Sequence, residues 1–198
     1  TVSGNVAFEA VGGREIAEKI VALSQFSKKD AYRATTENKG LFNGIGAVVL
    51  ATGNDWRAVE ASGHAYASQE GHYRSLTHWT ISDEQLRGEL TMPISVGTVG
   101  GVISAMNQAK NALDMMHVKS ADELRGIILA VGLAQNLAAL KAIAAGSIQR
   151  GHMRMQYRAL AVQVGALPQE VPMLVAKLNT LSQVDTAKAT EILMEMRK

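Results

Sequence analysis

The stretch from Ile127 to Ala145, IILAVGLAQNLAALKAIAA, constrains the fold more than any other part of this 198-residue chain. It is about long enough to cross a bilayer as a single helix. Gln135, Asn136 and Lys141 interrupt it, however, and polar groups of this kind oppose insertion into lipid. A helix that is apolar on most sides is more simply buried inside a protein or between subunits. The sequence therefore predicts a long buried helix and no membrane partner.

The composition excludes several classes of protein. Lys and Arg number 20 and Asp and Glu 18, so the net charge of +2 creates no strong field for nucleic acid. The absence of cysteine excludes disulfide scaffolds, thiolate metal sites, iron–sulfur clusters and cysteine nucleophiles. The first residues carry no signal-peptide pattern, and the lack of disulfides suits a cytoplasmic location.

Hydrophobic periodicity predicts a helix-rich α+β fold with one β-hairpin and a small helical C-terminal segment. Residues 30–40 are polar and rich in turn formers, which favours a loop, and the run 45–51 is uncharged, which favours burial. The expected strands are 2–8, 72–81 and 86–96, with a turn at 82–85. The expected helices are 14–29, a helix ending near residue 116, another from about residue 120 to 145, and two or three short helices over 152–198.

Arg33, Lys39, Asn43 and Asp55 form the first group of residues that could carry chemistry. Lys39 stands in the expected polar loop, and Asp55 follows the apolar run, where a carboxylate must meet a partner or leave the interior. A buried lysine beside a buried aspartate would keep its charge and could polarise a carbonyl oxygen. The simpler alternative is a surface lysine and a helix-capping aspartate.

The distance along the chain limits the pairing of Lys39 with Asp55. Sixteen residues separate them, which is about 24 Å along a continuous helix. Two arrangements could still bring them together. Either the chain turns back near Asn43–Gly46, or the two side chains come from different subunits.

The histidines supply a second group. His152 follows a glycine after the long apolar helix and could give or take a proton near neutral pH, unless it is an ordinary exposed histidine in a turn. His72 and His78 would share one face of a strand, with His64 nearby. Arg74 between them disfavours a metal ion, and we expect no metal site.

The glycine-rich segment Gly97-Thr98-Val99-Gly100-Gly101 precedes an expected helix. It has neither the dinucleotide-binding nor the P-loop spacing of glycines. The chain therefore shows no dinucleotide fingerprint of its own.

Five ordered segments resemble bacterial class II 3-hydroxy-3-methylglutaryl-CoA (HMG-CoA) reductases. The similarity is collinear over nearly the whole chain, which makes it far more specific than one short motif. The segments are YRATTENKG (32–40) with Asn43-Gly44, ATGNDWRAV (51–59), GTVGG (97–101), AVGLAQNLAAL (130–140) and QRGHM (149–153).

The resemblance implies the conversion of HMG-CoA to mevalonate and CoA by two hydride transfers from NADH or NADPH. Lys39 then matches the lysine that stabilises the developing oxyanion, and Asp55 matches the aspartate that tunes that lysine. His152 matches the histidine that protonates the departing CoA thiolate. Arg33, Asn43 and Gln135 match substrate contacts, and an arginine suits the free carboxylate of the HMG group.

The chain also departs from the family. The family's catalytic glutamate, in a Glu-Asn-Val-Ile-Gly-type motif, and its small NAD(P)-binding domain have no counterpart here. We therefore expect residues 1–148 to be the C-terminal part of the large catalytic domain and residues 149–198 to be a helical flap that closes over substrate. Such a chain would be inactive alone and would form a homodimer or a larger homo-oligomer, because the family's site lies at a dimer interface.

Two alternatives follow from the same residues. The chain could be a non-catalytic fragment that acts only in folding, dimerisation or scaffolding. It could instead belong to another CoA-thioester enzyme that uses the lysine and the histidine, although the residues that would bind the HMG group disfavour this.

Overall fold

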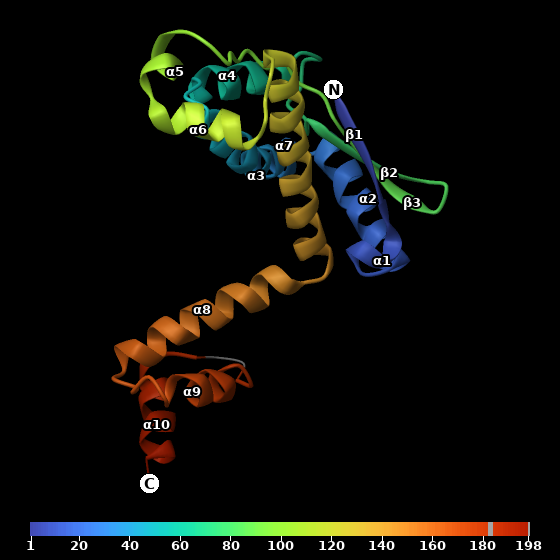
Figure 1. Ribbon diagram of the computed structural model, residues 1–198. Helices are drawn as coiled ribbons and strands as arrows, with labels where there is room; N and C mark the ends of the chain where they lie inside the picture. The colour runs from blue at the N-terminus through green and yellow to red at the C-terminus, as the bar shows by residue number, and fades with distance from the viewer. Residues whose placement is uncertain (182–183, 198) are drawn as a thin grey trace. The chain divides into compact units, whose positions relative to one another are not determined.

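The computed structural model describes residues 1–181 and 184–197, apart from the side chains of residues 102 and 147–154. Its contacts divide the chain into two compact units, Thr1–Ala144 and Ala145–Lys198, which are described separately (Figure 1). The first unit contains β1 (Val2–Ala7), α1 (Phe8–Val11), α2 (Arg14–Lys29), α3 (Ala31–Ala51), α4 (Trp56–Ala67), β2 (Thr77–Ser82), β3 (Gln85–Leu90), α5 (Gly101–Ala105), α6 (Asn107–Met115) and α7 (Ala121–Ala144). The second contains α8 (Ser147–Gln163), α9 (Val171–Leu178) and α10 (Thr186–Met196).

The three strands form one antiparallel sheet in the order β1-β3-β2. Asp83 and Glu84 both have positive φ angles, of 50° and 58°, as a tight two-residue hairpin turn requires. Gly88 on β3 pairs with Trp79 on β2. A Cβ atom at position 88 would lie 2.4 Å from the indole ring, so only glycine leaves room for it.

The core of the first unit forms where helices cover this sheet. Both α2 and α7 contact the strands, and α3 packs against α2 and α7 (Figure 1). The helix α7 is the one helix in the described part of the chain that is long and apolar enough to cross a membrane. Because α7 contacts α2, α3, β1 and β3, one face of it forms part of the core, but only 33% of its apolar stretch is buried, so the predicted burial is confirmed only in part.

The second unit has its own small core. The helix α9 packs against α8 and α10. The buried side chains include Tyr157, Leu174, Leu178 and Leu193. Glu170, just before α9, forms an ion pair of 2.7 Å with Arg197 at the end of α10, which closes the unit.

The helix-rich α+β class is confirmed, as are β1, α2, α7 and the hairpin. The expected loop over residues 30–40 is wrong, because α3 begins at Ala31 and continues to Ala51. Asp30 starts this helix by accepting a hydrogen bond from the Arg33 N–H at 2.7 Å. Several of the polar residues that favoured a loop find partners within the helix or in neighbouring segments, as the Thr35 hydroxyl does by donating to the Ala31 carbonyl.

Three boundaries also differ from the sequence prediction. The strand expected from residue 72 begins at Thr77, and the strand expected to reach residue 96 ends at Leu90, before Pro93. The helix expected to reach residue 116 is divided into α5 and α6. The apolar run 45–51 is only partly buried, since Leu50 remains 56% exposed.

Candidate functional site

One face of α3 carries two of the predicted site residues. Lys39 and Asn43 are both exposed and lie one helical turn apart, on the same side of the helix. Thr36 precedes them on this stripe and Ala47 follows, both also exposed. No hydrogen bond or ion pair involves the Lys39 ammonium or the Asn43 amide within the described residues, so both side chains are free to meet a ligand or another chain.

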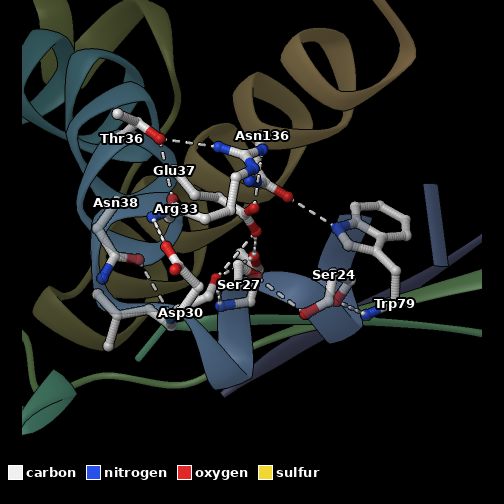
Figure 2. A network of polar contacts seen from close by, with 12 residues as sticks. Ser24, Ser27, Asp30, Arg33, Thr36, Glu37, Asn38, Trp79 and Asn136 are labelled. Carbon is white, nitrogen blue, oxygen red and sulfur yellow. Dashed lines mark hydrogen bonds and ion pairs between the residues drawn. The ribbon is translucent and has the colours of Figure 1, made fainter. Parts of the chain in front are cut away.

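Arg33 lies one turn before Thr36, the first residue of this stripe, and has a different environment. Its side chain is only 15% exposed. The Nη1 atom donates to the Thr36 hydroxyl at 2.9 Å, and Nη2 lies 3.1 Å from the Glu37 carboxylate (Figure 2). The guanidinium is therefore held in one orientation by its own helix, with part of it still reaching the surface.

Glu37 is the acidic partner of Arg33 and is buried, with 1% of its side chain exposed. The hydroxyls of Ser75, which precedes β2, and of Thr77, the first residue of β2, both donate to Glu37 Oε1 at 2.9 Å. Its other oxygen, Oε2, has no hydrogen bond in the described structure and faces the Arg33 charge. This carboxylate thus joins α3 to the sheet.

Asn38 forms a second link between α3 and the segment before β2. Its amide nitrogen donates to the Tyr73 hydroxyl at 3.0 Å and to the Arg74 carbonyl at 2.9 Å. Its amide oxygen accepts from the Leu76 N–H at 3.0 Å. With donor and acceptor both used, Asn38 fixes the side of α3 that faces away from Lys39.

Gln135 lies on α7 and packs against α3 at Gly44. A Cβ atom placed on Gly44 would lie 2.9 Å from the Gln135 Cβ and 3.2 Å from the Val131 carbonyl oxygen. The absence of a side chain at Gly44 therefore allows α7 to bring Gln135 against α3 at the residue that follows Asn43. Gln135 itself is exposed.

Asp55 caps the N-terminus of α4. Its carboxylate accepts from the N–H groups of Arg57 at 3.0 Å and Ala58 at 3.4 Å, and it is exposed. The Ala58 N–H is the main cause that lowers the pKa of the Asp55 carboxyl below its usual range, with the Arg57 N–H and guanidinium adding to this. Asp55 is consequently ionised at neutral pH.

Within one chain, the expected convergence of Lys39 and Asp55 in a buried pair is wrong. The residues 43–46 are helical, so the chain does not turn back there. From Lys39 to the end of α3 at Ala51 the helix rises about 18 Å, and Asp55 lies beyond that end. The helix α4 then returns along α3 with Gly63 against Phe42, which leaves Asp55 at the far end of α3.

The histidines do not gather at one place. His152 falls in the range of α8, and its side chain lies outside the described residues. His64 lies between the rings of Phe42 and Tyr73, and its Nδ1 is 2.8 Å from the Tyr73 hydroxyl. His78 lies on β2, where burial and the nearby charge of Lys28 lower its pKa, whereas His72 precedes the strand.

The described residues offer neither a metal site nor a dinucleotide cradle. No group of three or more His, Asp or Glu side chains among them could hold an ion. The glycine segment 97–101 leads into α5, whose five residues are too few for the helix N-terminus that binds a pyrophosphate in dinucleotide folds.

The sequence did not predict the buried polar network of Figure 2, in which Glu37 pairs with Arg33. One signal was available, because an arginine and a glutamate four residues apart pair on the same face of a helix. That signal required position 33 to be helical, which the loop prediction excluded. The hydroxyls of Ser75 and Thr77 had no local pattern that marked them.

Comparison with known proteins identifies relatives over nearly the whole chain. The sequence profile of a family described as hydroxymethylglutaryl-coenzyme A reductase matches residues 1–157. A 3-hydroxy-3-methylglutaryl-coenzyme A reductase of Archaeoglobus fulgidus is 40% identical over 190 residues, which are 96% of this chain and 43% of the relative. A probable reductase of the same name from Borreliella burgdorferi is 46% identical over 140 residues, which are 71% of this chain and 32% of the relative.

Solved structures give the same result. A 3-hydroxy-3-methylglutaryl-coenzyme A reductase from Streptococcus pneumoniae matches with a TM-score of 0.73 and 45% identity, over 98% of this chain and 48% of that one. The class II enzyme of the same organism bound to NADPH matches with a TM-score of 0.72 and 45% identity, over 99% of this chain and 49% of that one. The chain thus spans about half the length of these relatives.

Proposed function

The chain belongs to the hydroxymethylglutaryl-coenzyme A reductase family, and from this premise we propose that it supplies the substrate-binding part of a reductase. The proposed reaction interconverts HMG-CoA and mevalonate plus CoA by two hydride transfers with NADH or NADPH, in the cytoplasm. The observation that carries the proposal is the exposed stripe of α3, where Lys39 and Asn43 stand one turn apart, while Gln135 of α7 packs against Gly44 of the same helix.

Lys39 is proposed to stabilise the negative charge that develops on the thioester oxygen during reduction. A preorganised ammonium group lowers the energy of such an oxyanion most strongly where water is excluded. In this chain Lys39 is exposed and unpaired within the described residues. The proposal therefore requires the site to be closed by a further surface.

A second copy of the chain is proposed to provide that surface and the Asp55 that tunes Lys39. In a contact with two-fold symmetry, a residue i of one copy that meets residue j of the partner implies that residue j of the first copy also meets residue i of the partner. An axis near Ala47 would bring Lys39 of one copy toward the start of α4 in the other, because Ala47 lies midway between positions 39 and 55. Ala47 is small, exposed and on the same stripe, so two α3 helices could approach closely there.

The remaining roles follow the chemistry of the substrate. The guanidinium of Arg33 is proposed to bind the free carboxylate of the HMG group. Asn43 and Gln135 are proposed to hydrogen-bond its other oxygens. His152 is proposed to give a proton to the departing CoA thiolate, with residues 149–198 acting as a flap.

The described residues do not fit the nicotinamide cofactor. They lack the glycine spacing of a dinucleotide site, and the helix that follows the glycine segment 97–101, α5, has only five residues. We therefore derive no step through the cofactor from this chain.

Two measurements test the proposal. The first is a calorimetric measurement of HMG-CoA binding to the 198-residue chain. Acetyl-CoA, which has the same CoA group, serves as the competing ligand. The second is turnover, followed as loss of reduced nicotinamide, in a fusion of this chain with the unmatched part of the Streptococcus pneumoniae enzyme. Lys39→Ala should remove most turnover of the fusion while HMG-CoA still binds. Near-normal turnover of that variant would exclude the oxyanion role.

A purely structural role is the second candidate, and exposed apolar side chains favour it. Trp56 is 40% exposed and Leu50 56% exposed, near the same end of α3. Such a surface suits pairing with another chain. A chain that associates but shows no preference for HMG-CoA over acetyl-CoA would support this candidate.

A further inference from the structure

The ion pair between Arg33 and Glu37 differs from the other helical ion pairs of this chain by its burial. The pair Arg14–Glu18 has the same residue types, the same spacing and the same separation of 3.1 Å, yet its side chains are 63% and 58% exposed. In the Arg33–Glu37 pair the corresponding values are 15% and 1%. Solvent screens an exposed pair, whereas a buried pair fixes its members strongly.

Glu37 is itself held from the sheet side. The hydroxyls of Ser75 and Thr77 both donate to its Oε1 and lie 3.0 Å from each other, so the carboxylate cannot rotate away without leaving at least one buried hydroxyl without its acceptor. Its Oε2 is then left with the Arg33 charge as its partner. The orientation of Arg33 is thus set by a carboxylate that the sheet keeps in place.

The contacts of Arg33 leave part of its binding capacity unused. A guanidinium has five N–H donors. Thr36 accepts from Nη1, and Glu37 faces Nη2. The remaining donors belong to a group that still reaches the surface of the first unit, on the same helix as Lys39.

We propose that Glu37 is a positioning residue, which holds the Arg33 guanidinium so that its unused donors bind the carboxylate of the substrate. The inference rests on the proposed function, which assigns Arg33 to that carboxylate. A preoriented arginine loses less conformational entropy when an anion binds. Without Glu37, the buried charge of Arg33 would lack its partner and the side chain would leave this position.

The test compares the affinities of the 198-residue chain for HMG-CoA and for butyryl-CoA, whose acyl group has no free carboxylate. The preference for HMG-CoA should fall about tenfold in Glu37→Gln, which keeps the shape and loses the charge. Glu37→Asp, which keeps the negative charge, should retain part of that preference. Butyryl-CoA should bind equally to all these variants, and Glu18→Gln, which breaks the matched exposed pair, should change neither affinity.

A double-mutant comparison separates positioning from a general structural effect. If Glu37 acts through Arg33, Glu37→Gln should cause no further loss of preference in a chain that already carries Arg33→Met. Equal weakening of both ligands by Glu37→Gln, or an unchanged preference, would overturn the inference. The proposed function fails separately if Arg33→Met retains the preference. Circular dichroism of each variant establishes that it is folded. If Glu37→Gln does not fold, the comparison is made with Glu37→Asp.

Discussion

Asn136 interrupts the most apolar stretch of the sequence, and its environment explains how the helix accommodates it. The residue is 1% exposed, and its amide oxygen accepts a hydrogen bond of 2.7 Å from the indole nitrogen of Trp79. Trp79 is itself 2% exposed, so each group satisfies the other inside the core. A polar residue that argues against a membrane helix thus serves as a specific contact between α7 and the sheet.

Asn136→Ala should lower the free energy of unfolding of the first unit by about 1–3 kcal/mol, because the Trp79 N–H would remain buried without an acceptor. Urea titration followed by tryptophan fluorescence measures this, since both tryptophans, Trp56 and Trp79, lie in that unit. A double variant that also carries Trp79→Phe should lose less than the sum of the two single changes. An unchanged midpoint in Asn136→Ala would contradict the assignment.

Single residues show where sequence reasoning succeeds and where it stops. Asp55 could be predicted to leave the interior, because a carboxylate after an apolar run has few alternatives. The burial of Glu37 could not, because it depends on hydroxyls that lie 38 and 40 residues away. Such long-range partners leave no local periodicity.

At the scale of elements, two glycines allow α3 and α7 to pack closely. A Cβ atom on Gly44 would contact Gln135 Cβ at 2.9 Å, and one on Gly132 would contact Ile45 Cγ1 at 2.8 Å. These close contacts set the position of Gln135 against Gly44. The long helices themselves were predictable in part from periodicity, as α7 shows. The start of α3 was not, because its polar residues find partners only in the folded unit.

Two substitutions on α3 form a matched pair. Gly40→Ala meets no atom within 4 Å and should raise the stability of the first unit by about 0.5–1 kcal/mol, through helix propensity alone. Gly44→Ala gains the same propensity but must push α7 away, and it should lower stability by about 1–3 kcal/mol. The urea midpoints of the two variants measure the difference. Equal shifts in both would show that the two helices are not in tight contact.

In the second unit, the Glu170–Arg197 ion pair predicts a dependence on pH. The hydrogen bond from Arg197 and then the Leu167 N–H lower the pKa of Glu170 from 4.5 to about 2. A lowered folded-state pKa adds stability above the unfolded pKa, and that stability is lost as the pH falls from 4.5 through about 2.

Glu170→Gln should therefore destabilise the second unit at neutral pH, and its difference from the unmutated chain should disappear near the lower of these pKa values. Thermal unfolding by circular dichroism across that acidic range measures the difference, and an NMR titration of the Glu170 carboxyl measures its pKa directly. A difference that stays constant with pH would show that the ion pair adds nothing.

At the scale of the whole molecule, the site residues of one chain do not form a complete site. Lys39 lies near the middle of α3 and Asp55 beyond its C-terminal end, both exposed, and the stripe between them contains the small residue Ala47. A two-fold pairing of α3 helices would cover the exposed stripe and would also bring the charges of Lys39 and Asp55 together.

Ala47→Glu should weaken such pairing, since two like charges would meet at the axis. Sedimentation equilibrium should show a shift from dimer to monomer, with the circular dichroism of the chain unchanged. Ala187→Glu, an exposed alanine on α10, is the control and should leave the association unchanged. If both variants associate as strongly as the unmutated chain, the interface does not include this stripe of α3.

The most direct test of the account asks whether Lys39 and Asp55 act across two chains. Lys39→Ala and Asp55→Ala forms of the fusion are each expected to be inactive. When they are co-expressed, about half of the dimers combine one of each, and one of the two sites in such a dimer keeps both residues. The mixture should therefore recover about a quarter of the unmutated turnover, whereas either form mixed with the double variant should recover none. A mixture as inactive as its components, with mixed dimers demonstrated, would contradict the account.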